Sequence, residues 1–322
     1  MENRIYRLYD NETRYLGVNL MAFYSGLANS LQDLMDALVG HCTAEGWSWS
    51  DSILSKENTY VSLSVEDVGA FGTQNVIRLI AGKGVLGSTL QNKSPLGVAI
   101  GTAITNSNYG MTQFPVEYNL HINSNNEVFL ICKYSIDFFH WLAWGDNFIG
   151  GTFGVPQTGR FTYNHDRWPM VAIEINRGGS GNQDAPCCAF FWNTDYPNYA
   201  TPKNYTGSVW DGTNWITSSN AIQSLEPLVA RQSSNFFSES VLLPINIGRQ
   251  VASNKTQILA MVQNARYVRV DNYEPEQIIT LGSDKWKIYP FYRKNIQERD
   301  GGWFGGADHT GTFGWAIKYD GP

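Results

Sequence analysis

The chain has 322 residues, a formal net charge of −6 and a pI near 5.4. This length suffices for one large or two medium domains with substantial cores. The acidic balance and the lack of any block of Lys and Arg argue against a protein whose main task is to bind nucleic acid. No apolar run is long enough to predict a membrane span, and no segment has the pattern of a secretory signal peptide.

The composition favours strands and tight turns over helices. Aromatic residues make up 14% of the chain, with 11 Trp and 17 Tyr, and they are accompanied by 31 Gly. Bulky aromatic residues are strand formers, whereas Gly and Asn supply turns. Virion proteins, lectins and polysaccharide-acting enzymes of the all-β class share such compositions. The four cysteines lack zinc-ligand spacing, and we expect them to be reduced, small buried residues; they are Cys42, Cys132, Cys187 and Cys188.

Residues 1–20 are polar and have little to bury by themselves. Tyr6, Tyr9 and Tyr15 are spaced along this segment among residues of both charges. We expect an appended arm that is loose in a monomer or ordered on a neighbouring subunit. The sequence Met21-Ala-Phe-Tyr24 resembles a natural start, so we expect the main body of the protein to begin there.

The next segment predicts an amphipathic helix. Apolar residues recur at helical spacing from residue 27 to residue 42, at Leu27, Leu31, Leu34, Met35, Leu38, Val39 and Cys42. Asn29 or Ser30 can cap its start, and Gly46 lies just beyond its end. We expect the stripe to pack on the protein's own sheet rather than on a partner.

From Trp47 onward the pattern predicts strands separated by turns. Asn123-Ser-Asn-Asn126 between two apolar segments is a hairpin signal. The expected strands are 59–65, 76–81, 116–122, 127–136, 138–144, 170–175, 189–192, 209–216, 241–247 and 258–270, followed by a strand, a turn and a strand from residue 278 and a closing strand at 309–319. The predicted fold class is α+β, a predominantly antiparallel and sandwich-like β-sheet with one helix near the N-terminus. We predict an arm at 1–20, a helix and hairpin domain at 21–150 and a β-rich domain at 151–322. The alternative is that residues 21–322 form one continuous domain.

No constellation in the sequence predicts an enzyme, a metal site or a cofactor. His140 lies in a dense aromatic strand and is expected to be a core or interface residue, although Asp137 or Asp146 could orient it as a base. The pairs His165-Asp166 and Asp308-His309 place adjacent residues on opposite faces of an extended strand, so neither is a natural chelate. Lys285, Lys287, Arg293 and Lys294 alternate with aromatic residues and predict a solvated sheet face.

Two aromatic groups suggest surfaces that bind something outside the chain. Trp303 and Phe304 lie in the glycine-rich segment 301–306, expected to be a loop whose aromatic tip is buried in a partner or stacks on a sugar. Trp210, Trp215 and Trp303 lie near Asp and Asn groups that can hydrogen-bond sugar hydroxyls. These three tryptophans define an alternative glycan-binding hypothesis.

Three blocks of the sequence resemble a family of virion structural proteins that tailed bacteriophages and prophages encode among their neck and tail genes. The first is Met21-Ala-Phe-Tyr-Ser-Gly, a helix, and Gly46-Trp47. The second is the hairpin 127–144, which ends in Trp-Leu-Ala-Trp-Gly. The third is 278–319, with Gly-Ser-Asp-Lys-Trp, Arg-Lys-Asn and Thr-Gly-Thr-Phe-Gly-Trp-Ala-Ile.

The resemblance covers about a third of the chain and implies an architecture and a setting rather than active-site residues. It implies a non-enzymatic subunit of the virion at the neck, collar or tail, assembled in the bacterial cytoplasm. The implied partners are other virion proteins, namely portal, adaptor, connector or tail components, in a symmetric homo-oligomer or as decoration of a ring. Neither a membrane nor sequence-specific nucleic acid is among the expected partners. We expect Tyr6, Tyr9, Tyr15, Trp303 and Phe304 to contact neighbours, with the carbohydrate- or receptor-binding module of a fibre or baseplate as the alternative function. Residues 1–20 depart from the family pattern.

Overall fold

A computed structural model describes the main body of the chain, beginning at Met21. The described residues are 21–57, 59–67, 75–82, 84–93, 98–101, 114–123, 126–135, 138–145, 209–210, 215–216, 242–252, 255–270, 272–290, Lys294, 303–304, 307–308 and 313–322. The arm at 1–20 and the predicted strands 170–175 and 189–192 lie outside these residues. The division into 21–150 and 151–322 stays a prediction, since its boundary also falls outside them.

The described residues form mostly antiparallel sheets with a single helix, as predicted. The central sheet has the order β1-β9-β10-β11, with β1 at Met21–Ala28, β9 at Val116–Asn123, β10 at Val128–Ser135 and β11 at Phe138–Trp144. The N-terminal sheet has the order β2-β3-β4-β5-β8, with β2 at Ser48–Ser50, β3 at Ile53–Lys56, β4 at Thr59–Asp67, β5 at Asn75–Gly82 and β8 at Val98–Gly101.

The C-terminal sheet is the third large sheet. Its order is β14-β15-β20-β17-β16, with β14 at Leu243–Ala252, β15 at Lys255–Arg269, β16 at Ile278–Leu281, β17 at Asp284–Pro290 and β20 at Phe313–Lys318. Three small two-stranded pairs complete the described strands: β6 (Gly84–Leu86) with β7 (Thr89–Gln91), β12 (Val209–Trp210) with β13 (Trp215–Ile216), and β18 (Trp303–Phe304) with β19 (Ala307–Asp308).

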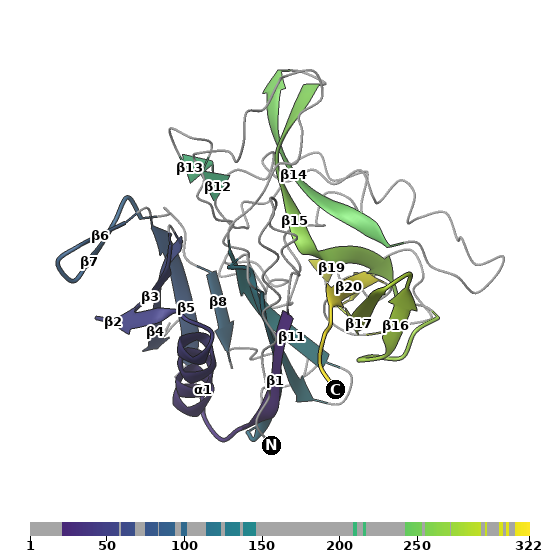
Figure 1. Cartoon of the computed structure of the whole chain (residues 1–322), viewed down its shortest axis with the longest axis horizontal. Helices are drawn as coiled ribbons and strands as arrows, with labels where there is room; N and C mark the ends of the chain where they lie inside the picture. The colour runs from purple at the N-terminus through teal and green to yellow at the C-terminus, as the bar shows by residue number, and fades with distance from the viewer. Residues whose placement is uncertain are drawn as a thin grey trace, which may run out of the picture.

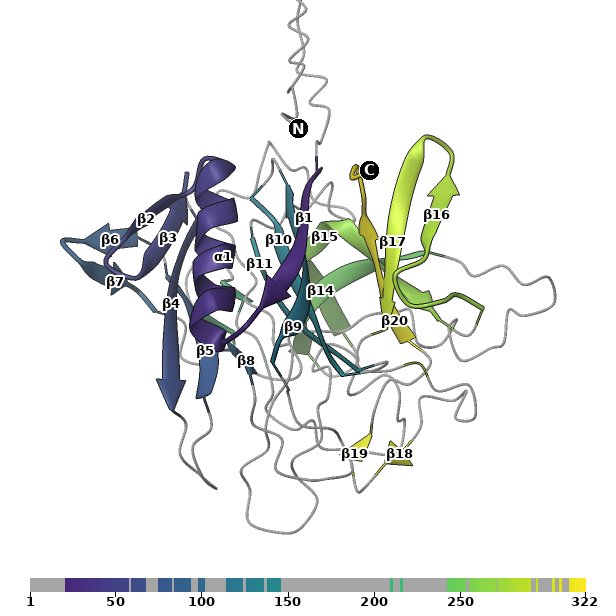
Figure 2. The same ribbon diagram turned by 90° about the horizontal axis from the view of Figure 1, so that it is seen from below.

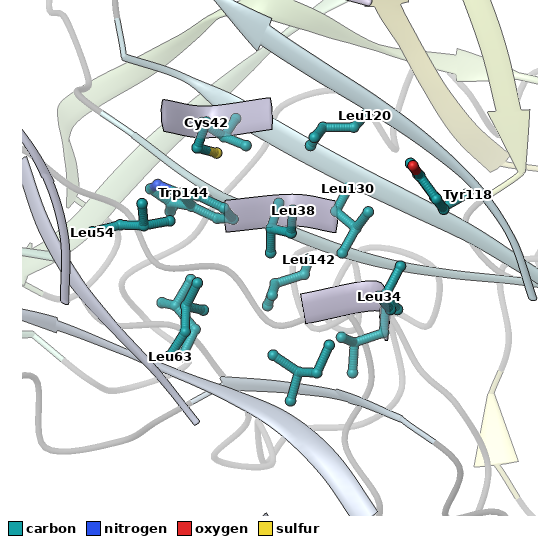
Figure 3. Close-up of a cluster of buried hydrophobic side chains, with 14 of the residues drawn as sticks. Leu34, Leu38, Cys42, Leu54, Leu63, Tyr118, Leu120, Leu130, Leu142 and Trp144 are labelled. Atoms are coloured by element: carbon teal, nitrogen blue, oxygen red, sulfur yellow. The ribbon is translucent and has the colours of Figure 1, made fainter. Parts of the chain in front are cut away.

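Helix α1 spans Leu31–Ala44 and lies between the N-terminal sheet and β1 (Figures 1 and 2). Ser30 is its N-cap, and the Ser30 hydroxyl accepts a hydrogen bond from the Asp33 N–H at 3.0 Å. The prediction that the stripe packs on the protein's own sheet is confirmed, because Leu34 and Leu38 are buried against strands of both sheets (Figure 3).

The prediction that Leu27 starts the helical stripe is wrong. Leu27 belongs to β1, where it pairs with Glu117 of β9 and is 64% exposed. Residues 21–28 lack a clean apolar alternation, and Leu27 fits the helical spacing of Leu31 and Leu34 by coincidence. Pairing with β9 therefore decides the conformation of this segment, rather than its own periodicity.

The two faces of the central sheet have different neighbours. One face joins helix α1 and the N-terminal sheet in a single core of buried side chains, shown in part in Figure 3. The opposite face contacts the C-terminal sheet through aromatic rings. The Trp141 and Trp315 rings meet edge to face at 4.8 Å between centroids, and Phe129 lies 5.9 Å from the same Trp315 ring.

Candidate functional site

The most chemically distinctive group of side chains lies where β9 of the central sheet meets β17 of the C-terminal sheet. The strand β9 alternates, so Tyr118, Leu120 and Ile122 join the apolar core while Asn119 and His121 fall on the opposite face. That pattern is typical of a strand with one solvated face. In the structure, however, Asn119 is only 2% exposed and His121 is fully buried.

Asn119 lies between a lysine and a carboxylate. The Lys287 ammonium donates to the Asn119 carboxamide oxygen, with Nζ and Oδ1 3.0 Å apart. The Asn119 amide nitrogen donates to Glu276 Oε1 at 2.9 Å. The same carboxylate oxygen lies 3.6 Å from Lys287 Nζ, so one oxygen faces both nitrogens.

The backbone of the C-terminal sheet fixes the lysine and the carboxylate. Lys287 is held in the middle of β17, opposite Ile278 of β16 on one side and Ile317 of β20 on the other. Glu276 ends the turn that leads into β16, and its N–H donates to the Ile288 carbonyl at 2.6 Å. Its φ of +68° is unusual for a residue with a side chain. Such a conformation persists where the surroundings hold it, and it is enriched at functional sites.

Aromatic rings enclose the Lys287 amine. Its Nζ atom lies 4.6 Å from the centroid of the Phe23 ring, 5.6 Å from that of Tyr319 and 5.7 Å from that of Tyr289. The Lys287 side chain is 12% exposed. The prediction of a solvated face is therefore wrong for Lys287, whereas Lys285 on the same strand is exposed. The rings shield the amine from most of the solvent and restrict its position.

Burial also changes the acid–base chemistry of this group. Desolvation lowers the pKa of Lys287, and the nearby Glu276 carboxylate opposes that shift without cancelling it. The neighbouring His121 accepts or donates a hydrogen bond at 2.9 Å between its Nε2 and the Tyr289 hydroxyl. Burial, with a smaller contribution from Lys287, lowers the pKa of His121 to about 3, so the imidazole is neutral at pH 7.

A fully buried carboxyl, that of Glu127, lies next to the turn of the β9–β10 hairpin. Glu127 Oε1 accepts from the Gln263 N–H at 2.8 Å, and Oε2 accepts from the Asn264 N–H at 2.9 Å and from its amide at 2.7 Å. Desolvation raises the pKa of Glu127 to about 7, although these three hydrogen bonds lower it. Glu127 thus joins the central sheet to β15 of the C-terminal sheet.

All five predicted interface residues fall where side chains are not described. Tyr6, Tyr9 and Tyr15 lie outside the described residues. Trp303 and Phe304 form strand β18, which pairs with β19 so that Phe304 is opposite Ala307. The expected loop is thus a short hairpin at these positions, because the backbone groups pair. In β12 and β13, Trp210 is directly opposite Trp215.

Exposed apolar side chains lie elsewhere and were not predicted. The β6–β7 hairpin carries Leu86, which is 73% exposed, and the β16–β17 hairpin carries Leu281, which is 50% exposed. Val85 and Ile278 of the same hairpins are also exposed. Turn signals at Gly282-Ser283 marked the second hairpin, but no sequence pattern distinguished an exposed strand end from a buried one.

The sequence also gave no sign of the Asn119, Lys287 and Glu276 group. These residues are far apart in the chain, and each has an ordinary neighbourhood in the sequence. The only available signal was a polar residue in every second position of β9, which reads as a solvated face.

The other chemical predictions can be tested only where the structure describes the residues. Cys42 and Cys132 are buried and free, as predicted, whereas Cys187, Cys188, His165 and Asp166 lie outside the described residues. His140 is opposite Cys132 in the β10–β11 pair. Among the described residues, no group of three or more His, Cys, Asp or Glu side chains could hold a metal ion. Within the same part of the chain, no helix is long and apolar enough to cross a membrane.

Comparisons with known proteins add no family assignment: no family model matches the chain, and no curated protein matches it significantly.

Proposed function

We propose that the chain is a non-enzymatic structural subunit of a tailed-phage virion, located at the neck, collar or tail and acting by assembly with other proteins. Its partners would be portal, adaptor, connector or tail components, and it would form a symmetric homo-oligomer or decorate a ring. The proposal rests on the resemblance of three separated sequence blocks to a virion protein family.

The observation that carries this proposal is the packing of those blocks on one another. Trp47 of the first block lies 6.1 Å from Trp144 of the second, between ring centroids. Trp141 of the second block contacts Trp315 of the third. The third block returns to the first, where the Tyr319 ring lies 4.9 Å from Phe23. The three blocks thus contact one another through aromatic rings on both faces of the central sheet, as expected if they define one architecture.

The arrangement of the sheets belongs to the same proposal. We propose that the central and C-terminal sheets pack face to face as a sandwich, with Trp141, Phe129 and Trp315 between them. Rigid sheets of this kind suit a subunit that works by shape. The exposed leucines at the ends of two hairpins supply apolar area that a neighbouring subunit would cover.

The experiment is a reconstruction of the phage particle that contains this protein, combined with assembly assays of the purified chain. We expect a ring-like set of copies at the neck or tail. Leu281→Lys should weaken assembly with little change in the melting temperature, because Leu281 is 50% exposed in the isolated subunit and the new cation would lie opposite Asp284. Leu281→Met, which keeps the apolar surface, should assemble normally. A monodisperse monomer that never associates with particles or with virion proteins would refute the proposal.

The alternative is a carbohydrate- or receptor-binding module of a tail fibre or baseplate. The register that sets Trp210 opposite Trp215 favours it, because paired aromatic residues on adjacent strands are a common platform for sugar rings. A glycan array separates the two functions. Binding that disappears in the alanine variants of Trp210, Trp215 and Trp303 would support the alternative, and the absence of any glycan signal would remove it.

A further inference from the structure

The group formed by Lys287, Asn119 and Glu276 has the composition and geometry of a self-reacting site. It combines an amine, a carboxamide and a carboxyl group in a mostly buried space between two sheets. An ordinary buried ion pair needs only the lysine and the carboxylate. Here a carboxamide lies between them, with its oxygen 3.0 Å from the amine and its nitrogen 2.9 Å from the carboxylate.

We propose that Lys287 and Asn119 join in an intramolecular isopeptide bond between Nζ of the lysine and Cγ of the asparagine, with Glu276 as the residue that carries protons during the reaction. The bond would link β9 of the central sheet to β17 of the C-terminal sheet. This modification is independent of any role in a virion, because it needs only the folded chain.

The proposed reaction exchanges one carbon–nitrogen bond for another and involves no oxidation or reduction. Glu276 takes a proton from the Lys287 ammonium and leaves a free amine, which attacks Asn119 Cγ. The carboxyl group passes its proton to the amide nitrogen of Asn119, and the bond between Cγ and this nitrogen breaks. Glu276 then takes the second proton of the attacking nitrogen and passes it to the released ammonia, which leaves the site as ammonium. The products are a secondary amide and the regenerated carboxylate.

The position of Glu276 suits proton transfer with both nitrogens. Its Oε1 atom lies 3.6 Å from the nucleophilic nitrogen and 2.9 Å from the leaving nitrogen, so no side-chain movement across the site is needed. Its other oxygen lies 3.7 Å from Lys133 Nζ, and that contact holds the carboxylate in place. The φ of +68° at Glu276 shows that the fold maintains an uncommon backbone conformation at this residue.

The surroundings favour the amine as a nucleophile. A lysine reacts as the free amine, and removal from water increases the fraction in this form. The Phe23, Tyr289 and Tyr319 rings surround the nitrogen at 4.6 to 5.7 Å from their centroids. They also limit the access of water, which would otherwise compete for the electrophilic carbon. The lowered pKa of Lys287 has the direction that this chemistry requires.

Mass spectrometry of the intact, purified wild-type chain tests the proposal directly. We expect a mass below that of the sequence by one ammonia molecule. Trypsin should release residues 94–133 covalently joined to residues 286–293, because an acylated Lys287 is no longer cleaved. The denatured protein should also migrate differently from an unlinked chain on a denaturing gel. A folded wild-type chain that retains the full sequence mass after long incubation would overturn the proposal and leave an ordinary buried ion pair.

Variants assign the roles of the three residues. Lys287→Arg keeps the positive charge but should show the full sequence mass, and Glu276→Gln should also stay unlinked although near-ultraviolet circular dichroism shows it folded. Lys285→Arg is the matched control, since Lys285 is an exposed lysine two residues before Lys287 on the same strand, and this variant should still lose ammonia. Loss of ammonia in Lys287→Arg would place the reaction elsewhere in the chain and refute the assignment. Loss in Glu276→Gln would refute the proton-carrying role.

Discussion

The buried carboxyl of Glu127 should make the stability of the protein depend on pH in a direction opposite to that of most carboxyl groups. Its pKa is raised from 4.5 to about 7 in the folded protein, chiefly by desolvation. The folded state therefore binds a proton more tightly than the unfolded state does. The stabilising effect of that proton is fully present below pH 4.5 and is lost as the pH rises through about 7.

The size of the effect follows from the two pKa values. At about 1.4 kcal/mol for each pKa unit, the shift corresponds to a loss of about 3 kcal/mol in the free energy of unfolding. In Glu127→Gln the side chain has nearly the same shape but does not ionise. We expect the wild type to lose about 3 kcal/mol relative to this variant between about pH 4 and about pH 8.

The assay is urea unfolding of both proteins at several pH values in this interval, followed by tryptophan fluorescence. Glu274→Gln, which removes an exposed carboxyl group instead, is the control and should follow the wild-type curve. The reasoning fails if the wild type and Glu127→Gln lose stability in parallel. That result would mean that the three hydrogen bonds from Gln263 and Asn264 compensate the burial of the charge.

Three further substitutions test the packing, and each is measured by urea unfolding at neutral pH. Gly314→Ala should cost about 3 kcal/mol, because the added Cβ would lie 2.1 Å from the Tyr289 carbonyl oxygen; an unchanged midpoint would show that β17 and β20 separate easily. Leu38→Ala removes a fully buried side chain of α1 and should also cost about 3 kcal/mol, whereas a loss below about 1 kcal/mol would contradict the core in Figure 3. Ser30→Ala removes the helix cap and should cost about 1 kcal/mol, with Ser30→Asp, which still caps, close to the wild type.

Local sequence patterns predicted much of the described secondary structure. The helix and its Ser30 cap followed from apolar spacing and a capping residue, and the β9–β10 hairpin followed from the turn residues 123–126. These features depend on neighbours in the chain. β1 was missed because its conformation depends on pairing with β9, which lies far along the sequence.

The candidate site was beyond local patterns for a related reason. Asn119 and His121 alternate with apolar residues, and such alternation normally marks a face in water. The structure buries both, because Lys287, Glu276 and Tyr289 supply hydrogen-bond partners from the C-terminal sheet. Whether a polar face is wet or covered is decided by residues more than a hundred positions away, and a single sequence does not reveal that pairing.

The link between Asn119 and Lys287 also has a mechanical consequence. The two residues are 168 positions apart. Each lies in a strand that pairs with a terminal strand of the described chain, since β9 pairs with β1 and β17 pairs with β20. If they are covalently joined, tension between Met21 and Tyr319 would cross directly from one strand to the other. The chain between residues 119 and 287 would carry no load and would not lengthen when the ends are pulled. The linked chain would then lengthen under tension only by opening the two segments outside that loop, residues 21–119 and 287–319, or by breaking a covalent bond.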